Sequence, residues 1–407
     1  MSARRTTAWL CLAAGLIGAA PAAAAPLAVG ADCRLLKDGK PYRGVGVNYF
    51  DGFLRTLADP NDRSAEAQFG RLAAAGIPFV RFAVLPYWPE EARAHVEAPD
   101  RLFAALDRFV ADAERHGLGL IPSVFFNLTT APDVMGEPVS AWADRDSRTA
   151  AFARRFARSL AARYAGSPAI WAWEFSNEAN NWSDFAEAYR YFPANLARGA
   201  PQARTPRDNY SSAALKAVLA DFRGAIRAGD AARLVTTGHG LPRHDAWRVA
   251  RGLQGVDRRR EFEDALADES DAADLTSLHV YPSVLRGAYT ERFADGKIDA
   301  AELITVAAQA AQNACKPLFL GEFGAADDGT DGDPSASFAA FRRLLDAFVT
   351  SPAPLAAAWV FDFPYQESRD GAMNMTFANS RRNRLEALRD VNARLNAPQA
   401  PSQSGMK

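Results

Sequence analysis

The chain has 407 residues, of which 48% are hydrophobic and 23% charged, and its formal net charge is −1. These values are typical of a globular protein with enough apolar residues for a large core, and closed α/β barrels often use this much chain as one unit. The balanced charge and the lack of a long basic run give no support to binding of nucleic acid or of an anionic membrane.

The first 25 residues have the features of an export signal. Arg4 and Arg5 precede the apolar stretch TTAWLCLAAGLIGAA, and the small residues of PAAAAP follow it. This order is typical of a signal peptide, and the apolar stretch is too short to span a membrane comfortably. We therefore predict that residues 1–25 are removed, and that the mature protein is secreted or periplasmic and free of the membrane.

Eight short apolar segments with strand character follow along the rest of the chain. They cover residues 43–50, 78–86, 118–126, 171–180, 233–240, 275–282, 317–324 and 355–363. Helical patterns lie between or after them, at residues 64–76, 101–117, 148–166, 212–230, 299–315, 333–351 and 384–396. Helix-start signals place Ser64 as one N-cap, and Asp333 as another with Pro334 at the first helical position.

Eight strand signals that alternate with helices or long loops predict an α/β fold of the (β/α)8 TIM-barrel type, in a single domain over residues 26–397. The segment GVGVNYF lacks the third glycine of a dinucleotide-binding turn. Residues 398–407, PQAPSQSGMK, have the composition of a disordered tail.

The long connections are expected at one end of this barrel and the two mature cysteines at the other. The segment from about Ala179 to Ser211 and the one after the eighth strand follow strands, where barrel enzymes build their active sites. Cys315 comes just before the seventh strand, and the segment that holds Cys33 would cover the same end. In an oxidising compartment this favours a Cys33–Cys315 disulfide over two free thiols.

Two glutamates, Glu178 and Glu322, end the fourth and seventh predicted strands. Two carboxyl groups about 5–5.5 Å apart are what a retaining glycosidase requires. One donates a proton to the leaving oxygen, and the other attacks the anomeric carbon. Other chemically active or aromatic residues share this end of the strands, namely Arg81, Asn177, His279, Tyr281 and Trp359.

The segments FSNEAN and FLGEFG, which hold these glutamates, resemble clan A of the glycoside hydrolases, the retaining barrels with glutamates on strands four and seven. The segments GVNYF, VRFAVLP and HVYP make the chain most similar to glycoside hydrolase family 5, the cellulase and mannanase group. The resemblance covers nearly all of the mature chain and implies the following roles: Glu178 as acid/base, Glu322 as nucleophile, Asn177 on the sugar 2-hydroxyl, Arg81 in support of the nucleophile, His279 and Tyr281 in the cleft, and Trp359 as a stacking floor.

The chain departs from the family pattern at two places. The family usually has proline after the Asn-Glu pair, where this chain has Ala179, and its third strand commonly ends near a histidine, where PSVFFN offers only Asn127. These departures leave the sugar open. Further candidates for substrate binding or support are Asn48, Trp182, Trp88 and Tyr365.

Each candidate also has a structural interpretation. Glu322 could be a surface charge at a strand end and Glu178 a carboxylate at a helix start, while His279, Tyr281 and Trp359 could pack in the core. Arg81 follows Val80 in a buried strand and therefore needs a carboxylate partner, either Glu322 or Glu174. Strand alternation places Glu174 on the same side as Glu178 but deeper, so we expect it to be a structural partner of Arg81.

No metal or cofactor is predicted. The five histidines form no HxH or HExxH pattern, and the acidic segment DDGTDGD at 327–333 lacks EF-hand spacing and is more typical of a solvated loop before a helix. The sequence thus predicts an exported, monomeric, retaining β-glycoside hydrolase that acts on a β-linked glucan or mannan polysaccharide or oligosaccharide. The alternatives are a transglycosylase that uses the same intermediate and a catalytically silent carbohydrate-binding barrel.

Overall fold

Eight parallel strands form the central sheet of the computed structural model, which describes residues 27–282, 293–327, 334–368 and 371–397. The strands are β4 (Gly44–Asn48), β5 (Phe79–Ala83), β6 (Gly119–Phe125), β7 (Ala172–Ser176), β8 (Leu234–Thr236), β9 (Thr276–Val280), β10 (Leu318–Phe323) and β11 (Leu355–Ala358). Their order is β8-β7-β6-β5-β4-β11-β10-β9. A parallel bridge between Thr236 and Leu275 joins the two edges. The predicted (β/α)8 barrel is confirmed.

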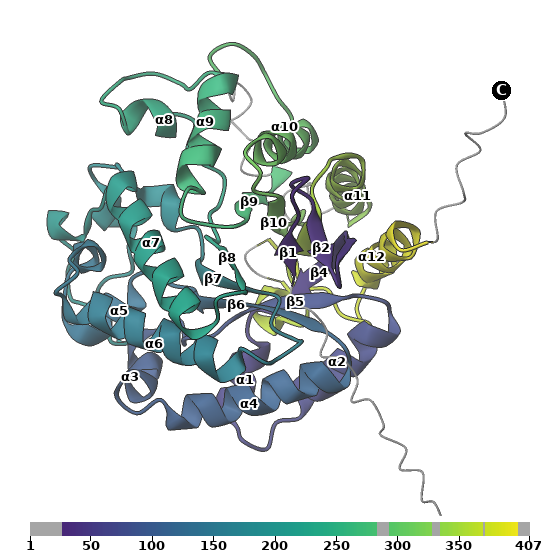
Figure 1. Cartoon of the computed structure of the whole chain (residues 1–407), viewed down its shortest axis with the longest axis horizontal. Helices are drawn as coiled ribbons and strands as arrows, with labels where there is room; N and C mark the ends of the chain where they lie inside the picture. Colours follow the sequence, from purple (N-terminus) through teal and green to yellow (C-terminus); the bar gives the residue numbers. More distant parts are fainter. Residues whose placement is uncertain (1–26, 283–292, 328–333, 369–370, 398–407) are drawn as a thin grey trace, which may run out of the picture.

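Helices surround the barrel (Figure 1). The long ones are α2 (Ser64–Ala74), α4 (Asp100–Arg115), α6 (Arg148–Tyr164), α7 (Ser212–Gly229), α9 (Arg259–Glu269), α10 (Ala300–Asn313), α11 (Pro334–Thr350) and α12 (Arg382–Leu395). Shorter helices lie in the connections, namely α1 (Gly52–Ala58), α3 (Pro89–Glu97), α5 (Thr130–Met135) and α8 (Ala246–Val249). Among the described residues, no helix combines the length and apolar character that crossing a membrane requires.

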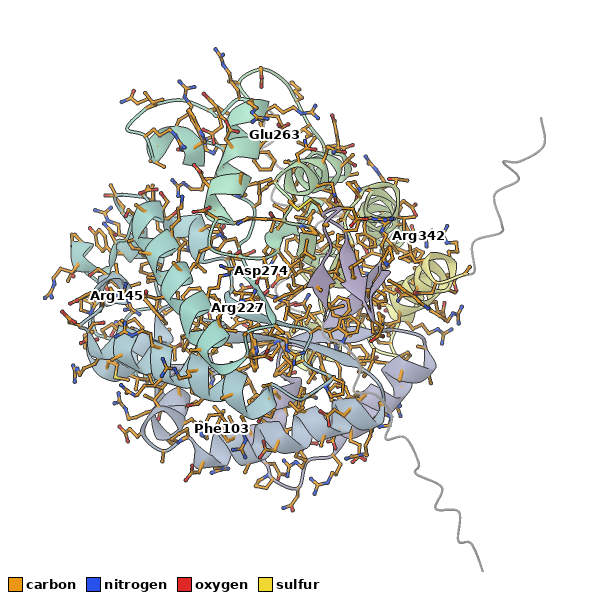
Figure 2. The ribbon with its side chains drawn as sticks, in the orientation of Figure 1. Phe103, Arg145, Arg227, Glu263, Asp274 and Arg342 are labelled. Atoms are coloured by element: carbon orange, nitrogen blue, oxygen red, sulfur yellow. A yellow bond between two sulfur atoms is a disulfide. The ribbon has the colours of Figure 1, made fainter. Side chains whose placement is uncertain are left out.

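The helices present charged residues to solvent and to their neighbours. Arg145, in the turn before α6, is largely exposed and lies 3.2 Å from Asp221 of α7, and Arg227 of α7 donates to Asp274, just before β9, at 2.8 Å (Figure 2). Asp274 also accepts the backbone N–H of Val235 at 2.9 Å. This carboxylate therefore helps to hold α7 at the seam where β8 and β9 meet.

Two buried apolar layers explain why the strands read as nearly continuous apolar runs. One lies between the sheet and the helices, and the other fills the inside of the barrel at the amino end of the strands. Strands buried on both faces show little alternation. The inner layer includes Phe79, Ile121, Trp171 and Phe319, together with Leu27 and Leu35 from the start of the described chain.

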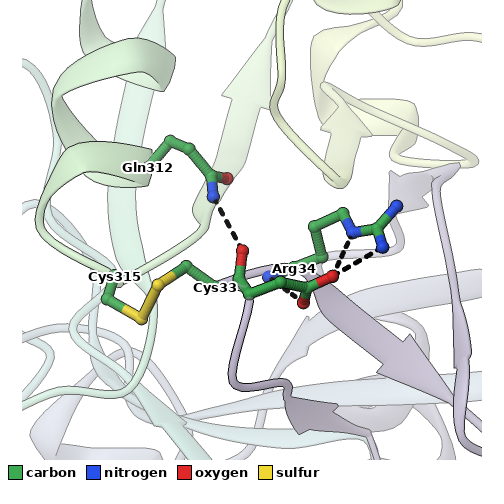
Figure 3. Close-up of a disulfide and its surroundings, with 5 residues drawn as sticks. Cys33, Arg34, Gln312 and Cys315 are labelled. Atoms are coloured by element: carbon green, nitrogen blue, oxygen red, sulfur yellow. Dashed lines mark hydrogen bonds and ion pairs between the residues drawn. A yellow bond between two sulfur atoms is a disulfide. The ribbon is translucent and has the colours of Figure 1, made fainter.

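A small antiparallel sheet covers the amino end of the barrel. It consists of β1 (Ala28–Val29), β2 (Leu35–Lys37) and β3 (Lys40–Pro41), and Figure 1 shows β1 and β2 in front of the barrel strands. A disulfide ties this sheet to the turn after α10: Cys33 and Cys315 are bonded, with their Cα atoms 4.7 Å apart (Figure 3). The predicted disulfide is confirmed.

The last helix also reaches this end of the barrel. The side-chain amide of Asn392 in α12 accepts the N–H of Val45 and donates to its carbonyl, both at 2.8 Å. The Asn392 side chain thus pairs with both backbone groups of Val45, as a neighbouring strand would, and it anchors α12 to the first residues of β4. Both ends of the described chain are therefore attached at the amino end of the barrel.

Some local predictions were wrong or fall outside the described residues. Ser64 is the first residue of α2 and not its N-cap: Arg63 holds the N-cap position without a side-chain cap hydrogen bond, and Asp62 accepts the N–H of Ser64 at 2.7 Å. Pro334 does begin α11. The predicted signal peptide, the predicted tail at 398–407 and the predicted N-cap Asp333 lie outside the described residues.

Candidate active site

The candidate catalytic residues gather at the carboxyl end of the barrel, beside a cavity of about 870 Å³. Asn177, Glu322 and Trp359 line this cavity, as do Trp88 and Tyr365. The connection from β7 to α7 forms part of its wall. This connection contains three short 3₁₀ helices, η2 (Ala179–Trp182), η3 (Ala188–Tyr191) and η4 (Pro206–Asp208).

Arg81 of β5 lies at the centre of the site and is completely buried. Its guanidinium contacts both carboxylates that the sequence offered as partners, with nitrogen–oxygen distances of 2.7 Å to Glu174 and 2.7 Å to Glu322. It also donates to the side-chain oxygens of Asn48 and Asn177, at 2.8 Å each. Burial works against this charge, but the two carboxylates outweigh burial and raise the pKa of Arg81 above its ordinary value.

Glu322 of β10 receives a donor at each oxygen. Arg81 donates to one, and the hydroxyl of Tyr281 donates to the other at 2.6 Å. Burial, followed by the charge of Glu322, raises the pKa of Tyr281 well above its ordinary value, so the hydroxyl remains a donor. This arrangement orients the carboxyl group of Glu322, and its remaining lone pairs can meet an electrophile.

Glu178 follows β7 in a left-handed backbone conformation, with φ of 51°. Such a conformation is uncommon for residues other than glycine and is frequent at functional sites. One carboxyl oxygen lies 3.0 Å from Nδ1 of His279, and the other accepts the Asn181 side-chain amide at 3.0 Å. Burial raises the pKa of Glu178, while Arg81 and the Asn181 hydrogen bond act in the opposite direction.

The two glutamates are close together and have different surroundings. One oxygen of Glu178, Nδ1 of His279 and one oxygen of Glu322 all lie within 4.8 Å of one another. This fits the short separation of about 5–5.5 Å in retaining glycosidases and not the roughly 6.5–9.5 Å of inverting ones. The same three groups could approach a cation, but the charge of Arg81 against Glu322 opposes a metal there.

His279 of β9 lies between the two glutamates with only 1% of its side chain exposed. Its Nδ1 is also 3.6 Å from the second oxygen of Glu322. Burial lowers the pKa of His279 to about 4, and Glu322 only partly offsets this. The imidazole is therefore neutral near pH 7 and bridges the carboxyl groups without adding charge.

Aromatic rings line the cavity. Trp359 directly follows β11, and the peptide bond between Trp359 and Val360 is cis. The indole N–H of Trp359 donates to Gln366 at 2.8 Å. Phe50 contacts Trp359 with ring centroids 5.9 Å apart, and Phe126 lies under the guanidinium of Arg81 at 5.4 Å. Neither phenylalanine was predicted. Phe126 immediately precedes Asn127, at the place where the sequence lacks the family's histidine.

Three other predicted residues have different surroundings. Asn48 is buried and donates to the carbonyls of Gly321 and Ala357, so it supports Arg81 from below. Asn127 donates to the carbonyl of Tyr87 at 3.0 Å and does not line the cavity. Trp182 stacks on Tyr191, with centroids 4.6 Å apart, and lies outside this cavity as well. Their roles toward substrate stay predictions.

Asn181 is the functional candidate that the sequence reasoning missed. It lies three residues after Glu178, which is the spacing of one turn of a 3₁₀ helix. If this turn had been predicted, the spacing would have indicated that the side chains of Glu178 and Asn181 meet.

Comparison with known families agrees with this geometry. The family model described as Cellulase (glycosyl hydrolase family 5) matches residues 37–346. The chain belongs to glycosyl hydrolase family 5. It is accordingly a glycoside hydrolase of the retaining type, and the predicted family is confirmed.

Solved structures of low sequence identity share the fold. An endo-1,4-β-mannanase from Rhizomucor miehei matches with a TM-score of 0.63 and 15% identity, over 89% of this chain and 97% of that chain. An endo-β-1,4-mannanase from Thermotoga petrophila matches with a TM-score of 0.61 and 17% identity, over 88% and 78%. An exo-β-1,4-mannosidase from an Opitutaceae bacterium matches with a TM-score of 0.59 and 17% identity, over 89% and 61%. A search of curated protein sequences found no match.

Proposed function

We propose that the enzyme is exported and hydrolyses β-linked mannan or glucan by double displacement, with Glu322 as nucleophile and Glu178 as acid/base. The observation that carries the proposal is the pair itself, two carboxyl groups within 4.8 Å in unlike surroundings. Two donors orient the carboxyl group of Glu322, whereas burial favours the protonated form of Glu178.

In the first step, an oxygen of Glu322 attacks the anomeric carbon as the bond to the leaving oxygen breaks. The proton of Glu178 passes to that oxygen, which leaves a glycosyl ester on Glu322 and an ionised Glu178. In the second step, Glu178 takes a proton from water while the water oxygen attacks the anomeric carbon. The ester bond breaks, and both glutamates return to their starting states.

The comparisons set the order in which sugars should be tested. The solved structures reported above are mannanases and a mannosidase by name, so β-mannan is the first substrate to test. β-Glucan is the second, because the family model is described as a cellulase. Export rests on the sequence of residues 1–25, and sequencing the amino terminus of the mature protein from the culture medium or periplasm tests it.

Glu322→Ala should lose hydrolysis of the active polysaccharide by roughly 10⁴-fold or more, because no covalent intermediate can form. The fold should persist, as judged by circular dichroism, and so should binding of oligosaccharide. Glu178→Ala should lose about 10²–10⁴-fold in kcat/KM on polysaccharide but much less in kcat/KM on a dinitrophenyl glycoside, whose leaving group needs no proton. The kcat on that glycoside should still fall, because the second step needs Glu178 as a base.

Unchanged hydrolysis in Glu322→Ala would contradict the mechanism. NMR of the first-formed anomer provides an independent check, since double displacement retains the β configuration. Products longer than the substrate would instead favour transglycosylation through the same intermediate. Binding of sugar without any turnover in the unaltered enzyme would favour a silent barrel.

A further inference from the structure

The turn after Glu178 contains two adjacent asparagines whose side chains are both directed to the surroundings of its carboxyl group. This turn, η2, follows the left-handed residue Glu178, whose backbone N–H donates to the carbonyl of Gly238 at 2.8 Å. Asn181 then donates to one oxygen of Glu178 at 3.0 Å. The other oxygen is 3.0 Å from His279, so each carboxyl oxygen has a neighbour on its own side.

Asn180 reaches the same carboxyl group through the backbone of Gly240. Its side-chain oxygen accepts the N–H of Gly240 at 2.9 Å, and its side-chain nitrogen donates to the Gly240 carbonyl at 3.2 Å and to Glu269 at 2.9 Å. Asn180 is 3% exposed, so these bonds are shielded from water.

Gly240 forms a surface against which Glu178 packs. A Cβ atom on Gly240 would lie only 3.0 Å from Cγ of Glu178 and 3.1 Å from its carboxyl carbon. The hydrogen bonds from Asn180 therefore hold the Gly240 backbone in place. This backbone in turn limits where the Glu178 carboxyl group can move. About a third of the Glu178 side chain remains exposed, which leaves it a path to substrate.

We propose that Asn181 and Asn180 are positioning residues for the acid/base carboxyl group of Glu178, Asn181 by a direct hydrogen bond and Asn180 through Gly240. This inference rests on the proposed role of Glu178. It assigns a task to the segment EANN, in which the chain departs from its family at Ala179.

The direct hydrogen bond has a consequence for the proton on Glu178. A donor binds a carboxylate more strongly than a carboxylic acid, so Asn181 favours the ionised form, and burial favours the protonated one. The other titratable groups around Glu178 and its neighbours are Arg81, Tyr281, His279, Glu322, Glu174, His239 and Glu269, all of which the variants below retain. Because Glu178 must donate a proton in one step and accept one in the next, a balance between these effects suits its task.

Asn181→Ala should therefore move the alkaline limb of the kcat/KM profile to higher pH, by about 0.5–1 unit, because the pKa of Glu178 rises when the donor is lost. Asn181→Asp keeps the shape of the side chain and replaces the donor with a charged acceptor, so it should shift the limb at least as far. This second variant keeps the test open if the alanine variant folds poorly.

Asn209→Ala is the matched control. Asn209 belongs to the same connection and binds the backbone of Ala186 and Tyr189, away from Glu178. Its loss should leave the alkaline limb in place. An alkaline limb identical to wild type in folded Asn181→Ala and Asn181→Asp would overturn the role of Asn181.

Asn180→Ala tests whether Asn180 positions Glu178 through Gly240, by comparing two substrates that differ in leaving group. A misplaced acid slows glycosides that need a proton on the leaving oxygen, so we expect kcat/KM for the polysaccharide to fall about tenfold or more. The same value for a dinitrophenyl glycoside should stay within about twofold, because that leaving group departs unprotonated. An equal loss on both substrates would overturn this role.

Gly240→Ala should crowd Glu178 and so lower kcat/KM for the polysaccharide more than kcat/KM for the dinitrophenyl glycoside. Gly224→Ala in α7, where an added Cβ has no neighbour within 4 Å, should not produce this difference. The proposed function can fail separately: it fails if Glu178→Ala shows no dependence on the leaving group.

Discussion

Arg81 carries a positive charge in a place where water cannot reach it. A buried charge is tolerated only when partners of opposite charge and hydrogen-bond acceptors surround it. Glu174 and Glu322 supply the charge, and Asn48 and Asn177 supply further acceptors. The two carboxylates have unequal tasks, because Glu174 is completely buried whereas Glu322 faces the cavity.

Replacement of Arg81 by methionine should lower the free energy of unfolding by about 3–5 kcal/mol, because it leaves Glu174 buried without a counter-charge. Hydrolysis should be lost as well, since Glu322 loses one of its two donors. Urea titration and turnover of the active polysaccharide measure the two effects.

The double variant Arg81→Met/Glu174→Gln separates stability from catalysis. Because it removes the unpaired charge, it should recover part of the lost stability but none of the activity. Equal stability of the single and double variants would contradict the pairing argument.

Protonation of His279 makes the stability of the folded protein depend on pH. The pKa of His279 is about 4 in the folded protein, against about 6.5 for a histidine in an unfolded chain. Between these values the unfolded chain binds more protons, so the stability that neutral His279 contributes is fully present above about pH 6.5 and is lost as the pH falls toward 4.

His279→Asn should therefore lose less stability than the wild type when the pH is lowered from 7.5 to 4.5. Urea midpoints at both pH values measure the difference within each protein, which cancels the neutral-pH cost of the substitution. An equal or larger loss of stability in the variant would show that another group controls stability between pH 7.5 and 4.5.

At the scale of elements, the strands could be predicted because barrel strands are apolar on both faces and end in polar residues. The placing of Glu178 and Glu322 followed from those strand ends. Side-chain partners across the barrel did not follow. The sequence required a carboxylate for Arg81 and strand alternation favoured Glu174, but contact with both Glu174 and Glu322 could not be worked out from alternation, because it depends on distances between strands.

The long β7–α7 connection was expected at the substrate end, but its internal structure was not. Residues 179–182 form a turn that follows Glu178 in a left-handed conformation, which glycine usually supplies, and no local sequence signal marks this conformation. For the same reason Asn181 was missed. The error at Ser64 is of another kind, since the helix begins one residue earlier than that cap required, and Asp62, two residues before Ser64, accepts its N–H.

At the scale of the whole molecule, closure depends on contacts between distant parts of the chain. The first barrel strand, β4, pairs with β5 and with the last strand, β11. The disulfide adds a second long link, across a separation of 282 residues. It lies at the amino end of the barrel, opposite the glutamates, so it bears on stability and not on chemistry.

Cys33→Ser/Cys315→Ser should lower the free energy of unfolding by about 2–4 kcal/mol, because a link that closes so long a loop restricts the unfolded chain. The kcat at a temperature well below unfolding should match that of the wild type. Thermal unfolding with and without reductant supplies the control: the reductant should lower the Tm of the wild type and leave the variant unchanged. A Tm of the wild type that is insensitive to complete reduction would contradict this account.

The attachment of both described chain ends to the amino end of the barrel has a practical meaning. Leu27 lies in the apolar cluster at that end, and Asn392 anchors α12 there by its bonds to Val45. A solid support or a fused partner domain joined at either end would therefore sit behind the catalytic machinery. Such a conjugate would present its open face outward to an insoluble polymer.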